Sequence, residues 1–317
     1  LANSTVSNNS GSYGGGGITA NSSSVSLANS TVSNNSASWG GGIFTYNSSS
    51  VSLANSTVSY NSGSYGGGGI TANSSSVSLA NSTVSNNSAN FGGGIFAYSS
   101  SVSLANSTVS NNSTSSWGGG IIVDNSSVSL ANSTVSYNST STKGGGIYAR
   151  LSSSVSLANS IISGNTAGTD GDEIFSSGFG SVSTLTTAHN NLFGHSSLTL
   201  TDAFTNFTPG ATDINATSGG DNIALSSILN TTLANNGCQQ KAGAPSTAAC
   251  VQTHALVSGS PAIDGADEAV CLGTDQRGKP RKDGMMMPIK TTTGNIAVVN
   301  LGDDYCDIGS VEFSSGD

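Results

Sequence analysis

The chain has 317 residues, of which 8% are charged and 42 are glycine, and its formal net charge is −9 at neutral pH. With only eight Lys and Arg residues it has no basic surface for nucleic acid. No apolar run approaches the roughly 20 residues that a membrane-spanning helix needs. This composition alone favours a disordered, low-complexity chain over an ordinary globular domain.

The order of the residues predicts the opposite, because one sequence unit returns at an almost constant interval of 25 to 27 residues. The unit is Leu-Ala-Asn-Ser, and its copies begin at Leu1, Leu27, Leu53, Leu79, Leu104, Leu130 and Leu157. Repeats of this length are typical of solenoids. Within each repeat apolar and polar residues alternate, as in Ser24 to Leu27, which indicates short strands with one buried face.

Three further aliphatic columns accompany the leucines. They are Val6, Val32, Val58, Val84, Val109, Val135 and Ile162; Val25, Val51, Val77, Val102, Val128, Val155 and Val182; and Ile18, Ile43, Ile70, Ile95, Ile121, Ile147 and Ile174. Each repeat is therefore predicted to be a coil of three short strands, with the Gly-Gly-Gly run as one of its turns. Four buried aliphatics contribute roughly 6 to 12 kcal/mol, whereas ordering a coil costs on the order of 30 kcal/mol.

One coil alone therefore cannot fold, and the coils must stack. The predicted fold is all-β, a parallel β-helix with coils of about 26 residues. We expect regular coils over residues 1–200, and irregular terminal coils with a C-terminal cap over residues 201–317.

An unchanging asparagine column predicts a ladder of side-chain amides inside the solenoid. Its members are Asn9, Asn35, Asn61, Asn87, Asn112, Asn138 and Asn165. The preceding position varies between Asn8, Tyr60, Tyr137 and Gly164, so the constancy of the next one favours an inward, hydrogen-bonded role. The alternative is that Asn is simply a favourable turn residue.

Aromatic residues precede the glycine run in five consecutive coils. They are Tyr13, Trp39, Tyr65, Phe91 and Trp117, and Lys143 ends the series. Rings spaced by about 4.8 Å can stack into an aromatic ladder along one edge. Such a strip suits carbohydrate binding or self-association, and the alternative is that the rings only cover the backbone of the turn.

The first charged residue is Asp124, so the first four coils hold no group for acid-base, metal or phosphate chemistry. Asp170, Asp172 and Glu173 replace the glycine run of the seventh coil, where they either bind Ca²⁺ or form a solvated acidic turn. A pectate-lyase-like polysaccharide-degrading enzyme would need acids and a base on one face. The spacing of the coils predicts that Lys143, Arg150, Asp172 and Glu173 could be neighbours.

All four cysteines follow the decay of the repeat. We expect Cys238 to pair with Cys250 and Cys271 with Cys306, because each pair brackets a local loop. Free thiols are the alternative. Disulfides would place the chain outside the cytosol.

The segment from about Thr232 to Phe313, which contains "CLGTDQRGKPRKDG" and "CDIGSVEF", resembles the terminal region of bacterial choice-of-anchor Q domain proteins. The coils, with "GGGI" and "STVSNNS", resemble the repeats of polymorphic outer-membrane proteins. The resemblance implies a right-handed parallel β-helix exported to the cell surface. It defines no single enzymatic activity. Among the charged residues of the matching segment, we expect Asp275, Arg277, Arg281 and Asp307 to form a network that holds the cap.

These features predict a non-enzymatic structural solenoid, extracellular or on the cell surface, acting as a stalk or as a filament subunit. In a filament, which is expected because the chain begins in mid-coil, the C-terminal cap would dock on the strands of Leu1 to Ser10 of another copy. The alternative is a binding module: a glycan adhesin, or an ice-binding face built on rows such as Thr31 and Ser33. The Thr and Ser rows are Thr5, Ser7, Thr31, Ser33, Thr57 and Ser59. No cofactor is expected apart from calcium.

Overall fold

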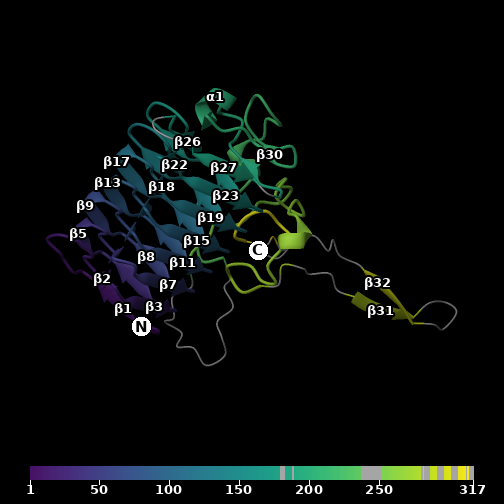
Figure 1. The fold of residues 1–317 in the computed structure, drawn as a ribbon. Coiled ribbons are helices and arrows are strands. Elements are labelled where there is room, and N and C mark those ends of the chain that lie inside the picture. Colours follow the sequence, from purple (N-terminus) through teal and green to yellow (C-terminus); the bar gives the residue numbers. More distant parts are fainter. Residues whose placement is uncertain are drawn as a thin grey trace.

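The computed structural model describes residues 1–178, 183–187, 189–236, 251–279, 281, 286–290, 296–300, 306–311 and 313. Short parallel strands stack coil on coil from the N-terminus upwards and form four sheets that follow the solenoid axis (Figure 1). The all-β parallel solenoid predicted from the sequence is confirmed, and successive coils pair in register, as Val32 with Val58 shows.

The strands are named here by sheet. Sheet A contains β3 (Ser24–Ala28), β7 (Ser50–Ala54), β11 (Ser76–Ala80), β15 (Ser101–Ala105), β19 (Ser127–Ala131), β23 (Ser154–Ala158) and β27 (Thr184–Thr187). Sheet B contains β1 (Thr5–Ser7), β4 (Thr31–Ser33), β8 (Thr57–Ser59), β12 (Thr83–Ser85), β16 (Thr108–Ser110), β20 (Thr134–Ser136), β24 (Ile161–Ser163), β28 (Leu192–Phe193) and β30 (Ile214–Asn215).

Sheet C contains β5 (Ser36–Trp39), β9 (Ser62–Gly66), β13 (Ser88–Phe91), β17 (Ser113–Trp117), β21 (Ser139–Thr140) and β25 (Thr166–Ala167). Sheet D contains β2 (Ile18–Asn21), β6 (Ile43–Tyr46), β10 (Ile70–Asn73), β14 (Ile95–Tyr98), β18 (Ile121–Asp124), β22 (Ile147–Arg150), β26 (Ile174–Ser176) and β29 (Phe204–Thr205). The remaining elements are α1 (Leu200–Ala203), two 3₁₀ turns (Leu225–Ser227 and Glu268–Val270) and the antiparallel pair β31 (Met286–Lys290) and β32 (Ile296–Asn300).

A full coil therefore has four strands, and the three predicted from the aliphatic columns miss sheet C. The strand Ser36–Trp39 turns only Ala37 inwards, so it has no aliphatic column, and backbone pairing with the coils on either side defines it. The valine column also ends earlier than predicted, because Val155 pairs with Leu185. Val182 lies outside the described residues. The solenoid continues beyond residue 200, as far as β30.

The core is a narrow apolar column inside the four sheets. Leu27, Val32 and Ile43 supply it from sheets A, B and D of one coil, and each is at most 1% exposed. The same set recurs in the following coils, as the alternation predicts. Each coil thus buries its apolar face against its neighbours.

Two of the corners turn at a single residue in the left-handed region. Asn29 has φ 48° between sheets A and B, and Asn34 has φ 55° between sheets B and C. Asn adopts this conformation more readily than other residues that carry a side chain. This explains the variable position before the asparagine column, which holds Asn, Tyr or Gly and must accept a positive φ.

The asparagine column forms an inward ladder at the corner between sheets B and C. The Asn61 amide Nδ2 donates to the Asn87 Oδ1 at 3.0 Å and to the backbone carbonyl of Val32 at 3.0 Å. The Asn87 Oδ1 also accepts from the Asn61 backbone N–H at 2.9 Å. The same bonds recur from Asn9 to Asn165, so backbone groups that would be buried without partners at this corner are satisfied.

Serine ladders, which the sequence analysis did not identify, stabilise two other corners. The Ser56 backbone N–H donates to the Ser82 Oγ at 3.2 Å, and the Ser75 N–H donates to the Ser100 Oγ at 3.1 Å. The constant Ser of Leu-Ala-Asn-Ser could have predicted such a ladder, because it is as constant as the Asn. Serine is so frequent in this chain, however, that its constancy at one position does not stand out.

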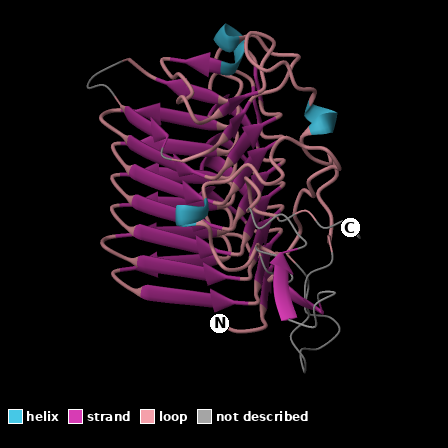
Figure 2. Ribbon diagram, turned by 90° about the vertical axis from the view of Figure 1, so that its right-hand side faces the viewer, coloured by secondary structure: helices cyan, strands magenta, loops and turns pink. Residues whose placement is uncertain are grey.

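The C-terminal region lies along the side of the solenoid, whereas a cap on its last coil was predicted. We call residues 251–279 and 306–311 the strap. It binds outward polar groups of successive sheet B strands: Gln252 carbonyl to Thr83 Oγ1 at 2.7 Å, Gln276 Oε1 to Thr108 Oγ1 at 2.6 Å, and Ser310 N to Thr134 Oγ1 at 3.1 Å. Figures 1 and 2 show these loops running back beside the coils.

A disulfide between Cys271 and Cys306 joins the two parts of the strap, as predicted. The predicted pair Cys238 and Cys250 lies outside the described residues. Cys306 belongs to a second apolar cluster in which Ile308 and Leu256 pack on Ile161 and Leu192. The strap is thus attached by apolar packing, by hydrogen bonds to sheet B and by one covalent link.

Replacing both Cys271 and Cys306 with Ser should cost about 3 to 4 kcal/mol in the chain-entropy account of a loop of this length. The strap should become sensitive to protease before the coils, because its residues do not belong to the apolar core column of the solenoid. Limited proteolysis and circular dichroism, followed together during heating, measure the two events. If strap and coils are lost at one temperature in the variant, the strap is not a separate unit of stability.

Candidate functional site

The site begins at the glycine corner between sheets C and D. Gly40 has φ 56°, and a Cβ on Gly41 would lie 2.3 Å from the backbone oxygen of Ser62 in the next coil. Only glycine permits this close stacking of turns. The tight corner brings the outward side chains of the two sheets to face one another.

Rings on sheet C form a continuous ladder over four coils. Ring centroids are 4.6 Å apart between Trp39 and Tyr65, 5.4 Å between Tyr65 and Phe91, and 5.2 Å between Phe91 and Trp117. Tyr13 departs from the predicted ladder and packs edge-on against Phe44 at 6.1 Å. The run of four glycines places Tyr13 and Tyr65 alike one residue earlier than Trp39, so that Gly14 and Gly66 pair with Trp39 in sheet C.

A second ring column on sheet D, which the sequence analysis missed, faces the first. Its rings are Phe44, Phe96, Tyr148 and Phe175, and the aliphatic Ile122 continues it between Phe96 and Tyr148. Trp39 stacks on Phe96 at 5.8 Å with an interplanar angle of 18°, and Trp117 stacks on Tyr148 at 5.6 Å and 6°. Each member directly follows the buried isoleucine of its coil. That position must point outwards in a strand, so the signal was available.

Large and small residues alternate from coil to coil over the first four coils of this corner. The Trp39 ring lies over Gly66, where a Cβ would approach a ring carbon to 2.6 Å. Thr71 stands between Phe44 and Phe96 in sheet D, and its hydroxyl donates to the Gly66 carbonyl at 3.1 Å. Coils with bulky rings thus alternate with coils that make room for them.

Residues of the two columns line a groove with a volume of about 560 Å³. Its lining residues are Tyr13, Trp39, Phe44, Tyr65, Thr71, Asn73, Phe91, Phe96, Tyr98, Trp117, Ile122, Asp124 and Arg150. We call it the aromatic groove. Eight of the thirteen lining residues are aromatic, so its walls suit flat, partly apolar ligands, while Thr71 and Asn73 supply polar atoms.

An ion pair forms one end of the aromatic groove. The Arg150 Nη2 lies 2.5 Å from the Asp124 Oδ2, and the guanidinium carbon lies 5.4 Å from the centroid of the Trp117 ring. Asp124 is only 1% exposed, so the Arg150 charge offsets part of the cost of burying its carboxylate, while the Trp117 face stabilises the guanidinium.

The calcium site expected at Asp170, Asp172 and Glu173 is not formed. Asp170 pairs with Lys143 at 3.4 Å, the Asp172 carboxylate accepts from the Ala167 backbone N–H, and Glu173 points into the core. Partial burial raises the pKa of Asp172 despite that backbone donor. No group of three potential ligands that could hold a metal occurs among the described residues.

Glu173 terminates the asparagine ladder. It is fully buried, and its carboxylate accepts from Asn165 Nδ2 at 2.6 Å and from the Gly164 backbone N–H at 2.8 Å. The equivalent residue in the preceding coil is Gly146, where a Cβ would lie 2.9 Å from Asn165 Nδ2. A side chain at this position therefore reaches the ladder, and the glutamate supplies the acceptor that the next asparagine would have provided.

Burial raises the pKa of Glu173 to about 8, although its hydrogen bonds from Asn165 and Gly164 lower it. The four residues weighed for lyase chemistry, Lys143, Arg150, Asp172 and Glu173, have different partners, and the last of them faces the core. The structure does not bring these four residues together.

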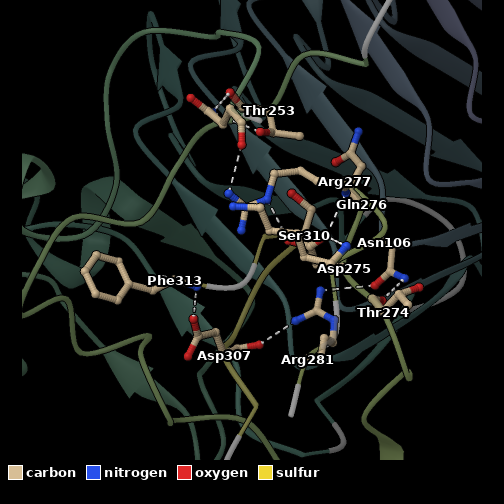
Figure 3. A network of polar contacts seen from close by, with 12 residues as sticks. Asn106, Thr253, Thr274, Asp275, Gln276, Arg277, Arg281, Asp307, Ser310 and Phe313 are labelled. Carbon is tan, nitrogen blue, oxygen red and sulfur yellow. Dashed lines mark hydrogen bonds and ion pairs between the residues drawn. The ribbon is translucent and has the colours of Figure 1, made fainter. Parts of the chain in front are cut away.

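The four charged residues expected to form a network are buried, Asp275, Arg277 and Asp307 in the strap and Arg281 beside it (Figure 3). Arg277 Nε donates to Asp275 Oδ2 at 2.7 Å. Arg281 donates to the backbone carbonyls of Asp307 and Gly309 at 3.0 and 2.7 Å. Burial raises the pKa of Asp307 to about 6, although backbone N–H groups of Phe313 and Asp264 donate to it.

The Thr and Ser rows considered for ice binding lie on the outer face of sheet B. Thr31 and Ser33 are partly exposed there. In later coils the strap covers the equivalent positions, for example Thr83 and Thr108. The regular exposed face is therefore limited to the first three coils.

The profile of the family described as right-handed β-helix region matches residues 1–135 and 42–236. The chain belongs to this right-handed β-helix family. No curated protein matches it in sequence. The crystal structure of the pectate lyase Pel9A overlaps it with a TM-score of 0.44 at 13% identity, over 98% of this chain and 86% of Pel9A. A likeness this weak carries no argument about the function of this β-helix. No helix among its described residues is long and apolar enough to cross a bilayer.

Proposed function

We propose that this β-helix is a non-enzymatic carbohydrate-binding solenoid that acts outside the cell, and that the aromatic groove holds the carbohydrate. The observation that carries the proposal is the pair of facing ring columns around a cavity of about 560 Å³. Sugar rings present flat faces of C–H groups that pack on aromatic faces, and their hydroxyl groups need a small number of polar partners.

The exposure of the rings supports this function. Tyr65 is 50% exposed and Tyr98 is 44% exposed, and both border the groove. Rings needed only to cover the glycine turn would be expected to be largely buried, as Phe96 is at 8% exposure. Large aromatic side chains left partly open along one groove are typical of binding surfaces.

The disulfide supports a place outside the cytosol, because such bonds persist in oxidising compartments. The resemblance of the C-terminal segment to choice-of-anchor Q domain proteins, and of the coils to polymorphic outer-membrane repeats, supports the cell surface. A stalk-like structural role is compatible with this function, since the same stacked coils build the groove and set the length of the solenoid.

Replacing Trp39 with Ala should weaken binding of a neutral linear hexasaccharide by about 10- to 100-fold, because one stacking face is lost. The matched control is Tyr60→Asn. Tyr60 is 61% exposed, lies outside the groove and has Asn34 as its equivalent in the preceding coil. Isothermal titration calorimetry with hexasaccharides of glucose, mannose and xylose measures both variants.

The control should bind as the unmodified chain does. If none of these sugars binds, or if Tyr60→Asn weakens binding as much as Trp39→Ala, the groove is not a carbohydrate site. Thermal unfolding of both variants, followed by circular dichroism, separates loss of binding from loss of fold.

A further inference from the structure

Resting on the carbohydrate-binding function above, we propose that the ligand is a linear, uncharged polysaccharide that lies along the solenoid axis and has a repeat matched to two coils. The first four coils of the groove have that period. Residues 1–26 and 53–78 are identical except for Asn8 and Tyr60, so the unit that recurs is a pair of coils, and this pair spans about 9.6 Å at the spacing of paired strands.

The alternation shapes the wall of the groove. One position of sheet C holds Gly14, Trp39, Gly66 and Phe91 in four successive coils. A Cβ at Gly14 would lie 2.4 Å from the Phe44 ring, and one at Gly66 would lie 2.6 Å from the Trp39 ring. The glycines therefore let rings from neighbouring coils lie over them, which places the bulky residues of this position in every second coil of the first four; Trp117 follows Phe91 directly in the fifth.

A polymer of pyranose rings matches this period. One pyranose unit is about as long as the rise of one coil, and in an extended 1,4-linked chain successive rings are turned over, so that every second ring presents the same face. Every second sugar would then meet Trp39 or Phe91, and the sugar between would meet the coil that carries Tyr65 and the polar Asn73. A ligand without a repeating unit could not make the same contacts with successive pairs of coils.

The charges of the groove favour an uncharged chain. Asp124 and Arg150 are the charged members of its lining, and they neutralise each other at 2.5 Å. A polymer of uronic acids would bring one carboxylate per sugar into a groove whose single guanidinium is already paired, on a chain with net charge −9. Repulsion and unpaired charge disfavour that ligand.

The end at which the groove can be lengthened follows from where the aromatic column of sheet C ends. Lys143 and then Asp170 continue the column after Trp117, so the groove closes at the Asp124 and Arg150 pair. Towards the first coils the ring pattern continues to Tyr13. Additional coil pairs inserted on that side would lengthen the groove, while the strap contacts, which begin at Ser82 and Thr83, would be retained.

The test is a variant in which residues 27–78 are duplicated in tandem, which adds two coils in the correct alternation. The matched control duplicates residues 53–78 alone and so places two coils of the Gly66 type next to each other. Calorimetry with neutral oligosaccharides of four, six, eight and ten units gives the length at which affinity stops rising. Oligogalacturonides of the same lengths serve as the charged probe.

We expect the two-coil duplication to move this plateau by two sugar units and to tighten binding of the longest oligosaccharide by about tenfold, and the one-coil control to leave the plateau where it was. Oligogalacturonides should bind at least tenfold more weakly. If neutral sugars bind and Trp39→Ala weakens them, but the plateau does not move or the charged probe binds better, this inference fails and the proposed function stands. If no glycan binds, both fail.

Discussion

Replacing Asn87 with Leu should lower the free energy of unfolding by about 4 kcal/mol or more. The Asn87 side chain accepts from the backbone and side chain of Asn61 and donates to the carbonyl of Val58 and to the Asn112 Oδ1. Leucine leaves these groups buried without partners, at about 1 to 3 kcal/mol for each unsatisfied group. Urea unfolding followed by circular dichroism measures the loss.

The neighbouring position supplies the control. Asn86 adopts φ 55°, and the equivalent residues of two other coils are Tyr60 and Tyr137. Asn86→Tyr should therefore change stability by less than about 1 kcal/mol. Equal losses from the two substitutions would mean that the asparagine column acts only through its turn conformation and not through a ladder.

Acidification from pH 7 to pH 4 should weaken attachment of the strap by about 3 kcal/mol through His254. This imidazole is buried against sheet B, with Nε2 2.7 Å from the Ser110 Oγ and Nδ1 2.8 Å from the Asn230 carbonyl oxygen. The carbonyl can only accept, so Nδ1 carries the proton and Nε2 accepts from the serine. The ring is thus bound in its neutral form.

Burial lowers the pKa of His254 from 6.5 to about 4, although the hydrogen bond to Asn230 raises it. The folded form therefore disfavours the charged imidazole. This contribution to stability is complete above pH 6.5 and is lost as the pH falls towards 4. Glu173 and Asp307, whose pKa values are raised by burial, act in the opposite sense, because the folded chain holds their protons more tightly.

The variant His254→Gln isolates the histidine, since an amide can also accept from Ser110 and donate to Asn230 without titrating. We expect the stability difference between the original chain and this variant to change by about 3 kcal/mol between pH 7 and pH 4. Hydrogen exchange of the strap at these two pH values measures it. A difference that does not depend on pH would show that His254 is accessible to protons in the folded state.

The coils could be predicted from the sequence because each inward position repeats. Val32 and its equivalents mark sheet B, and the asparagine column marks a corner, since an inward amide tolerates no replacement there. Sheet C escaped prediction because its strands, such as Ser36–Trp39, carry no aliphatic column. The wall of the groove on sheet D was missed because the residue at its outward position changes from coil to coil, for example from Phe44 to Thr71.

The strap and the role of Glu173 depend on contacts that local patterns do not contain. Thr108 meets Gln276 across 168 residues of chain, and nothing in either segment specifies the other. Glu173 lies among acidic residues of a turn, which favours a solvated or metal-binding role, and its inward direction follows only from the end of the asparagine ladder. The repeat thus predicts the solenoid and one wall of the groove, while the contacts that break the repeat require the structure.

The two tryptophans of the chain, Trp39 and Trp117, both line the aromatic groove, so intrinsic tryptophan fluorescence reports on this site directly. The chain should be titrated with a neutral linear hexasaccharide while emission and quenching by acrylamide are followed. If the groove holds the sugar, the emission should change saturably, acrylamide quenching should fall at least twofold, and the Tyr60→Asn variant should give the same curve. Saturable binding in calorimetry with unchanged tryptophan emission and quenching would contradict the account.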